Sequence, residues 1–451
     1  MKGLSSIYAD FICRTSYEKL SPEVVEQAKQ RILDLVGVSL AGYKLTEFPR
    51  LVVSYLASLG GTPEATIFVT KKKLPAINAA MANGVCAHAL DMDDGHRFAA
   101  LHPGAVVIPA SIAAAEMIGA STRDLIAGVV VGYEVMIRIG MAINPSSLGR
   151  GFHTTGTVGT FGAAASSANI MKLSYDETVG ALGLAGLQGS GILQVNHDVE
   201  GAKVKPINPA KAAMSGLFSS ILAREGCRGP VNVLEGEDGF LRATADEVRK
   251  ELLTRRLGEE FEIKNVYNKL YAACRHAHAS MDAVFEACGT EVNPGEIRKL
   301  SIKTYPAAVR LAGITHPSTP SAARFSIPFS VALILTKKDA GADKYCDETI
   351  GDPDIQKLAD KVELSADSKW EKLYPEKRGA TATITDVGNR VYSAEVGLPR
   401  GEPENPASEK EIHNKFLANT TLVVTKEHAE RLANIIKNLE NVSLKEFTGL
   451  L

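Results

Sequence analysis

The sequence lacks several features that would assign a protein to a class at once. Its 451 residues include six cysteines, and no two of them form a Cys-x-x-Cys pair. Structural zinc sites and iron–sulfur clusters usually need at least one close pair, so both are disfavoured. The net charge of −2 leaves no excess of basic residues. We therefore expect neither a nucleic acid nor an anionic membrane as a partner.

Long hydrophobic runs are also missing. The apolar stretch LIAGVVVGY (125–133) is much shorter than the ~20 residues that a membrane span needs. The start MKGLSSIYADFIC shows no charged leader followed by an apolar segment, so we expect a cytoplasmic protein. Most cysteines are expected to be small buried hydrophobic residues. A chain of this length is expected to form two or three domains.

The first half of the sequence is rich in helical patterns. In residues 21–42, Ser21 is a helix cap, Pro22 suits the first turn, and Gly42 is expected to end the helix. Ser174 and Glu177 have the spacing of a capping box. Between residues 76 and 225 the expected helices are dense in alanine, glycine and serine. Such helices can approach closely, which predicts a large all-α core.

The pattern changes near residue 295. Residues 297–305 alternate as in a strand, and 381–396 form a hairpin pattern around Gly388 and Asn389. A helix is expected between them at 326–338, and the tail 425–442 is helical again. The predicted fold is mainly α with a smaller α+β part. An all-helical domain would comprise 1–264 and 398–451, and an α+β domain would comprise 265–397.

A charged stretch, ALDMDDGHRFAALHPGA (89–105), lies between two apolar helical segments. A solvated loop would not normally have such flanks, so we expect this stretch to face a cavity. It could form a metal site, an acid–base site or an anion-binding site. Its titratable groups are Asp91, Asp93, Asp94, His96, Arg97 and His102.

Four further segments place titratable groups among small or apolar neighbours. Each group has a structural alternative, such as a hydrogen-bonded core histidine or a surface lysine. The occurrence of five such segments in one chain favours a shared site, although composition does not prove that they converge. The four segments contribute His153; Lys203, Lys205 and Lys211; Lys269, Cys274, Arg275, His276 and His278; and Tyr305, Arg310 and His316.

The motifs disfavour a metal or nucleotide cofactor. The Asp-x-Asp pattern before His102 resembles a ligand set, but Gly95 occupies a position where an EF-hand needs a ligand, and no His-Glu-x-x-His is present. No Gly-x-Gly-x-x-Gly follows a strand, and no Walker sequence occurs. The residues instead suit acid–base chemistry on a carboxylate, which lysine and arginine would hold while histidine or aspartate removes an α-proton. A non-catalytic binding protein remains an alternative.

Several segments resemble the MmgE/PrpD family, in order and over nearly the whole chain. They include NGVCAHALDMDD, GRGFHTTGTVGTFGAAA, VKPINPAKAAMSG, CRHAHASMDA, ARFSIPFSVALIL and GEPENPASEKEIHNKF. The resemblance implies a large all-helical domain with an α+β lid domain, a homodimer, and a site in the cleft between the domains. It also implies a small polycarboxylate substrate and no metal or organic cofactor.

The resemblance also suggests site residues, with some departures. By motif, the catalytic candidates are Asp91, His102, His153, Lys205, Lys269 and His278. The expected substrate-binding residues are Arg97, Cys274, Arg275, His276, Tyr305 and Arg310. Gly95 replaces a common threonine, and the spacing from it to His102 is one residue longer than usual. Asn208 replaces a common histidine, and Cys274 lies near a position where the decarboxylases have a catalytic histidine.

The resulting hypothesis is a hydro-lyase that resembles 2-methylcitrate dehydratase. His153 or Asp91 would take the α-proton, and His102, kept protonated by Asp91, would donate to the leaving hydroxyl. Lys205, Lys269 and Arg275 would hold the carboxylates. The acid and base could be exchanged. The alternatives are an epimerase of a dicarboxylate such as iminodisuccinate, a cis-aconitate-type decarboxylase, and a carboxylate-binding protein without catalysis.

Overall fold

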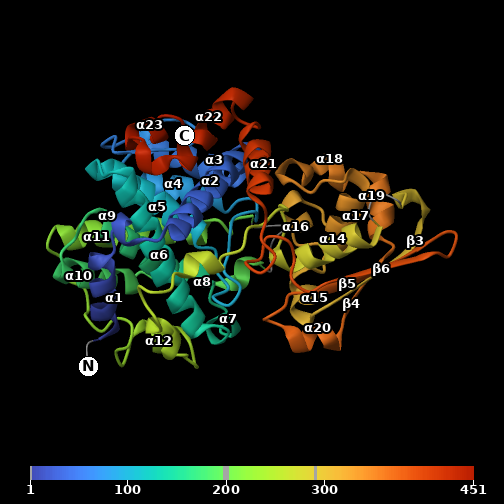
Figure 1. Cartoon of the computed structure of the whole chain (residues 1–451), viewed down its shortest axis with the longest axis horizontal. Coiled ribbons are helices and arrows are strands. Elements are labelled where there is room, and N and C mark those ends of the chain that lie inside the picture. Colours follow the sequence, from blue (N-terminus) through green and yellow to red (C-terminus); the bar gives the residue numbers. More distant parts are fainter. Residues whose placement is uncertain (1–2, 197–202, 289–291) are drawn as a thin grey trace.

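The computed structural model describes residues 3–196, 203–288 and 292–451, and it has a helical part and a part built on a sheet (Figure 1). The fold class predicted from the sequence, mainly α with a smaller α+β part, is confirmed. Gly201 and Ala202, which begin the lysine-containing segment, lie outside the described residues.

The helical part is formed mostly by the first half of the chain. It begins with α1 (Leu4–Arg14), α2 (Pro22–Leu45) and α3 (Glu47–Leu59), then β1 (Ala65–Thr66) and β2 (Lys73–Leu74). Its core helices are α4 (Ala76–Ala87), α5 (Gly104–Ile118), α6 (Thr122–Ile143), α9 (Gly159–Ile170), α10 (Tyr175–Gly186) and α11 (Ile207–Arg224). Shorter helices are α7 (Ser146–Gly149), α8 (Thr154–Thr157), α12 (Phe240–Thr244) and α13 (Glu251–Thr254).

Small residues let these helices pack closely, as predicted. A Cβ atom added at Gly132 of α6 would lie 2.5 Å from Val107 Cγ1 of α5 and 2.8 Å from the carbonyl oxygen of Gly162 in α9. Helix α6 is the one described helix that is long and apolar enough to cross a membrane. All of its most apolar window is buried inside the protein, which is typical of a core helix.

The capping predictions are confirmed, but two others are wrong. Ser21 accepts from the Val24 amide, and Ser174 forms the capping box. Gly42 does not end α2. A Cβ atom there would lie 2.2 Å from the Cys86 carbonyl oxygen, so glycine is needed for close helix contact. Of the six cysteines, all free, two are buried and two are exposed, so most are not core residues.

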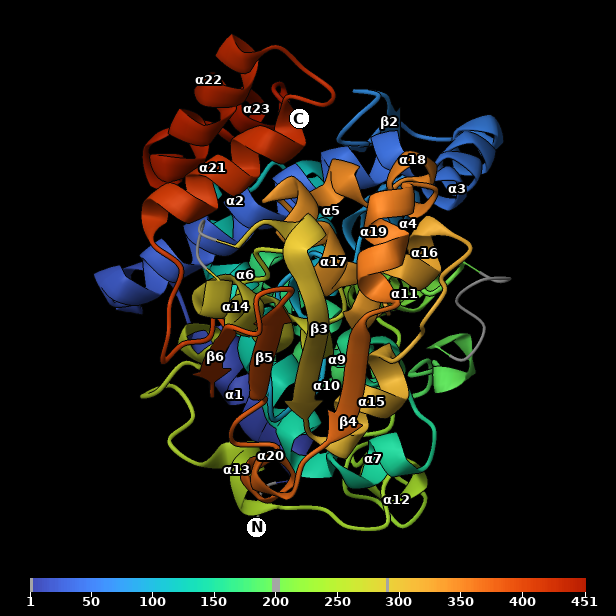
Figure 2. The same ribbon diagram turned by 90° about the vertical axis from the view of Figure 1, so that its right-hand side faces the viewer.

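The second part is a four-stranded sheet of order β4-β3-β5-β6 with helices on one face (Figure 2). Strand β3 (Ile297–Thr304) pairs in parallel with β4 (Val362–Ala366) and antiparallel with β5 (Ala380–Asp386). Strand β6 (Val391–Val396) completes the predicted hairpin, with Asn389 at φ +64° in the turn. The helices of this part are α14 (Arg275–Cys288), α15 (Pro306–Ala312), α16 (Pro320–Ala323), α17 (Ile327–Lys337), α18 (Asp347–Ile350), α19 (Pro353–Ala359) and α20 (Ser368–Leu373).

The end of the chain returns to the helical part. Helix α21 (Glu409–Thr420) packs on α2, and α22 (Lys426–Lys437) and α23 (Leu444–Thr448) follow. Phe416 is fully buried in the hydrophobic cluster of the helical part. A Cβ atom at Gly37 would lie 2.9 Å from its ring. A second hydrophobic cluster consists mostly of residues between Ala272 and Val396, so the chain leaves the helical part and comes back to it.

Candidate active site

The charged stretch predicted to face a cavity lies between α4 and α5 and is largely buried. Helix α4 ends at Ala87, and His88 follows as its C-terminal cap. Asp91 has φ +51°, a left-handed conformation that aspartate tolerates better than most residues. It therefore occupies a sharp turn within the loop.

A small pocket opens beside this turn. Residues of both parts of the fold line it, including His88, Asp91, Lys205, Ser321, Arg324 and Phe325. A larger hollow of about 1060 Å³ lies elsewhere on the helical part. The described residues of its lining include no histidine, and Glu116 within it is already paired with Lys73 at 3.1 Å. The smaller pocket is the one that adjoins the group of acids, histidines and lysines.

Asp91 is held between two lysines from distant parts of the chain. Lys205 Nζ lies 3.0 and 3.1 Å from the two carboxylate oxygens, and Lys269 Nζ lies 3.3 Å from Oδ1. Lys269 also donates to the Asp91 carbonyl oxygen at 2.7 Å. Burial raises the pKa of Asp91, but the two ammonium groups outweigh it and hold the pKa well below its usual range. Asp91 is therefore a stable anion and a weak base.

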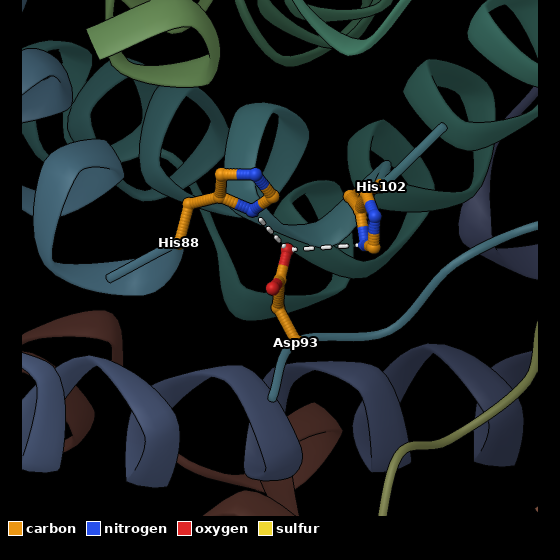
Figure 3. Close-up of side chains that lie close together, drawn as sticks. All are labelled: His88, Asp93 and His102. Carbon is orange, nitrogen blue, oxygen red and sulfur yellow. Dashed lines mark hydrogen bonds and ion pairs between the residues drawn. The ribbon is translucent and has the colours of Figure 1, made fainter. Parts of the chain in front are cut away.

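Asp93 is shared by two histidines (Figure 3). Its Oδ2 lies 2.7 Å from Nδ1 of His88 and 3.5 Å from Nδ1 of His102. The Nδ1–H of His102 donates to the Asp94 carbonyl oxygen at 2.6 Å, which leaves Nε2 with its lone pair. His88 Nε2 is buried without a hydrogen-bond partner among the described residues. Both rings can therefore accept a proton at Nε2.

The structure corrects the expected state of His102. The carboxylate beside it is Asp93 rather than Asp91, and burial lowers the pKa of His102 to about 3 despite Asp93. His102 is thus neutral near pH 7, and the lone pair of its Nε2 is available to accept a proton. It is not the protonated acid expected from the sequence.

His153 is placed differently from its predicted role as a base. Asn208 Nδ2 donates to its Nδ1 at 3.0 Å. Burial, and next the charge of Lys205, lowers the pKa of His153 well below its usual range. A neutral ring that accepts at Nδ1 has its hydrogen on Nε2, so His153 is a hydrogen-bond donor. The ring centroids of His88 and His153 are 6.1 Å apart, and those of His88 and His102 are 4.9 Å apart.

His88, Asp93 and His102 also form the group whose ligand atoms could hold a metal ion, since one such atom from each lies within 4.8 Å of the others. Two ligands at ~2.0 Å from a tetrahedral zinc ion lie about 3.3 Å apart. The His88–Asp93 distance of 2.7 Å is shorter and has the length of a strong hydrogen bond. The observed spacing therefore fits a hydrogen-bonded network better than a ligand cage.

The sheet part adds His276, Tyr305 and Cys274 near these groups. The Tyr305 hydroxyl and His276 Nδ1 are hydrogen-bonded at 2.6 Å. Burial, and then the nearby cations Arg378 and Lys269, lowers the pKa of His276 to about 3. Burial raises the pKa of the Cys274 thiol, and the charge of Asp91 adds to this. Cys274 is therefore a neutral thiol at this edge of the site.

Other predicted site residues are engaged elsewhere. Arg97 contacts Glu402 at 3.2 Å and also pairs with Glu404. Arg275 contacts Glu402 at 2.9 Å and donates to His278 Nδ1 at 3.0 Å. Because Glu402 and Glu404 together neutralise the two arginines, the predicted role of Arg97 and Arg275 in holding substrate is not supported.

His278 and most of the more distant candidates are also placed away from substrate. His278 is fully buried, and its Nε2 donates to the Ala273 carbonyl oxygen at 3.1 Å. Arg310 and His316 are exposed and do not line the pocket, whereas Lys203 is exposed but lies in the pocket wall beside Lys205. Lys211 donates to Gln188 and Ser190, and His96 lies 3.5 Å from Glu262. These groups contribute to packing, to the surface or to other networks.

Comparison with known protein families agrees with this arrangement. The model of the MmgE/PrpD N-terminal domain matches residues 7–252, and that of the MmgE/PrpD C-terminal domain matches residues 271–441. The chain belongs to the MmgE/PrpD family. The pocket of this family member is lined by residues from both matched regions.

Relatives within the MmgE/PrpD family include two kinds of lyase. The chain is 26% identical to human cis-aconitate decarboxylase, covering 98% of this chain and 93% of the relative. It is 25% identical to the cis-aconitate decarboxylase-like protein oryM of Aspergillus oryzae, over 93% and 90%. It is 25% identical to mitochondrial 2-methylcitrate dehydratase of Yarrowia lipolytica, over 87% and 79%. Family membership and these relatives support lyase activity.

The sequence did not single out three residues of this MmgE/PrpD site as important. His88 ends an apolar helix, one residue before the charged stretch began, and a polar residue there could have been noticed. Asp93 was noted but not distinguished from its acidic neighbours. Arg324 lies in the segment ARFSIPFSVALIL, which carries part of the family resemblance, but it is the one titratable group there and no charged neighbour in the sequence marks it as a site residue.

Proposed function

We propose that this MmgE/PrpD protein is a lyase that removes water from a hydroxylated di- or tricarboxylate, as in 2-methylcitrate dehydratase. The observation that carries this proposal is a neutral imidazole, His102, close to an aspartate held by two cations. Such a site can remove a proton α to a carboxylate and stabilise the charge that develops.

His102 is the proposed base. Its side chain is 15% exposed, whereas that of His88 is 0% exposed, so His102 is the more accessible of the two rings. Its Nε2 takes the α-proton, and the resulting imidazolium is stabilised by Asp93 and by the Asp94 carbonyl oxygen. Substrate carboxylates near Lys205 and Lys269 offset charges that lower the pKa of His102, so substrate binding strengthens the base.

Loss of the hydroxyl completes the reaction. The electrons of the broken C–H bond form the new C=C bond, and the C–O bond breaks. The Lys205 ammonium donates a proton to the departing oxygen, which leaves as water, while the His153 Nε2–H donates a hydrogen bond to the enolate oxygen of the activated carboxylate. The proton on His102 then returns to Lys205 or to solvent. The protein side chains carry these proton transfers in this proposal, without a metal or organic cofactor.

Decarboxylation of a cis-aconitate-type substrate is the second candidate. It is favoured by the near-complete coverage of relatives named cis-aconitate decarboxylase. It is disfavoured by Cys274, a neutral thiol near the position where the resemblance implies a catalytic histidine in decarboxylases.

Proton NMR of reactions in deuterated buffer tests these candidates. The substrates are citrate, 2-methylcitrate, cis-aconitate and iminodisuccinate. Dehydration of a hydroxy acid produces vinyl signals or a conjugated acid without loss of carbon, whereas decarboxylation releases CO₂. Epimerisation introduces deuterium at a stereocentre without forming an alkene, and this result would contradict the proposal. The same would follow if a hydroxy polycarboxylate bound but was not turned over.

Two variants connect the activity to the proposed base. We expect His102→Asn to reduce kcat by ~10²–10⁴-fold, because it removes the proton acceptor. His316→Asn is the matched control, since the His316 side chain is 77% exposed, and it should retain wild-type kcat. Dialysis against a chelator should also leave the rate unchanged.

A further inference from the structure

Arg324 is a buried cation that lacks an acidic partner. The residue is 3% exposed, and among the described residues no carboxylate lies within 4 Å of its guanidinium. Nη1 donates to the Pro320 carbonyl oxygen at 3.1 Å, and Nε has no hydrogen-bond partner in the described ranges. The guanidinium carbon lies 5.6 Å from the centre of the Tyr345 ring. Most of the donor capacity of this arginine therefore remains available.

Other buried arginines show what is missing at Arg324. Arg138 pairs with Glu134 at 2.5 Å, and Arg275 pairs with Glu402. Within the described part of the chain, Arg31 and Arg378 also form no ion pair and do not line the pocket, but Arg31 donates to two side-chain amides. Arg324 alone among these five combines burial, a missing acid and a place in the pocket wall.

A buried guanidinium without a counter-ion is unfavourable, because it loses hydration and gains no ionic hydrogen bond. Burial lowers the pKa of Arg324 to about 10, so the group is still a cation near pH 7. Asp91 is the acid of the pocket that acts on it electrostatically, but its oxygens already contact Lys205 and Lys269. An anion from outside the chain would supply the missing charge.

The pocket gives Arg324 a position suited to this task. Ser321, one helical turn earlier, lines the same pocket. The adjacent Phe325 ring lies 5.3 Å from Lys205 Nζ, so the loop carrying Arg324 is next to the lysine proposed to protonate the departing oxygen. The Arg324 carbonyl oxygen accepts from the Cys274 amide at 2.8 Å, which fixes this loop against α14.

We propose that Arg324, with Ser321, forms a subsite that binds a second carboxylate of the substrate, away from the carbon that loses its proton. The inference rests on the proposed function and identifies the residues that would bind the second carboxylate of its substrate. A planar guanidinium can hold one of them through two parallel hydrogen bonds. Arg324 is thus a specificity-determining residue.

Calorimetric titration with three non-reacting ligands tests this subsite. Tricarballylate has three carboxylates. Glutarate has the same chain without the central carboxylate, and butyrate has that chain with one terminal carboxylate. Wild-type protein should bind glutarate ~10–100-fold more tightly than butyrate, the range expected for a charged hydrogen-bonded pair. In Arg324→Gln this preference should disappear while butyrate binding stays the same. Arg324→Lys should retain part of it.

The control is Arg298→Gln, which replaces an exposed arginine on β3 and should retain the wild-type preference. Circular dichroism of each variant reports folding, and Arg324→Lys provides the same comparison if Arg324→Gln does not fold. A preference that survives in Arg324→Gln would overturn the proposal, as would wild-type protein that binds none of the three ligands. If the preference depends on Arg324 but no polycarboxylate is turned over, the subsite stands and the lyase proposal fails.

Discussion

Replacing Asp93 by asparagine would remove one charge from the carboxylate shared by His88 and His102. The side chain keeps its size, and the amide oxygen can still accept from His88. In the proposed reaction His102 becomes positively charged 3.5 Å from Asp93. With an effective dielectric constant of about 20, this attraction is worth about 5 kcal/mol. If about half of the charge has developed in the transition state, kcat should fall by ~10²-fold.

The assay is a steady-state kinetic comparison of wild type, Asp93→Asn and the control Asp282→Asn. Asp282 is also a buried aspartate, but it contacts Tyr271 and the Arg400 amide outside the pocket. We expect KM for Asp93→Asn to stay within a few-fold of wild type, since Lys205 and Arg324 are unchanged. A variant with nearly wild-type kcat and an unchanged pH profile would refute the role given to Asp93.

Three further predictions concern the site and the fold. Asn208→Asp should reverse the tautomer of His153, because a carboxylate accepts a hydrogen bond from Nδ1–H. We expect kcat to fall ~10-fold or more and its pH dependence to shift. An unchanged pH dependence of kcat would contradict the assigned tautomer. Burial lowers the pKa of four histidines (His102, His153, His276 and His278) below the unfolded value of about 6.5. Below pH 6.5 the unfolded chain therefore binds more protons than the folded chain. The free energy of unfolding, measured in urea, should decrease steadily from pH 6.5 to pH 4. A flat profile would argue against neutral buried rings. Gly42→Ala should lower the free energy of unfolding by ~1–3 kcal/mol, because its Cβ would lie 2.2 Å from the Cys86 carbonyl oxygen. Gly60→Ala is the comparison: residue 60 has φ +64°, and a Cβ there meets nothing within 4 Å, so this variant measures backbone strain without crowding.

Local sequence patterns were sufficient for most of the fold. The capping box at Ser174 and the hairpin at Asn389 involve residues that are close in sequence, so the chain reveals them directly. Gly42 shows the limit of this reasoning. A glycine near the end of an apolar pattern resembles a helix stop, but its neighbour is Cys86 on another helix. Only the packing of α2 against α4 distinguishes the two cases.

The sequence identified which residues form the candidate site better than it identified their protonation states. Motifs identified Asp91, His102, His153, Lys205 and Lys269, which the structure brings together. Their protonation depends on burial and on the neighbour at each nitrogen, and neither can be read from sequence spacing. For the same reason the sequence suggested Arg97 and Arg275 as carboxylate binders, since it does not show that Glu402, more than a hundred positions away, contacts both.

The return of the chain to α2 has a consequence for synthesis on the ribosome. Lys415 on α21 donates to the Met92 carbonyl oxygen at 2.9 Å and pairs with Asp34 of α2 at 2.6 Å. The turn that contains Asp91 and Asp93 is thus stabilised by the Lys415 side chain, which is synthesised more than three hundred residues later. During translation the early helices can collapse, but this loop lacks its last anchor until α21 has left the exit tunnel. A nascent chain therefore acquires the ordered form of this loop only after α21 has been synthesised.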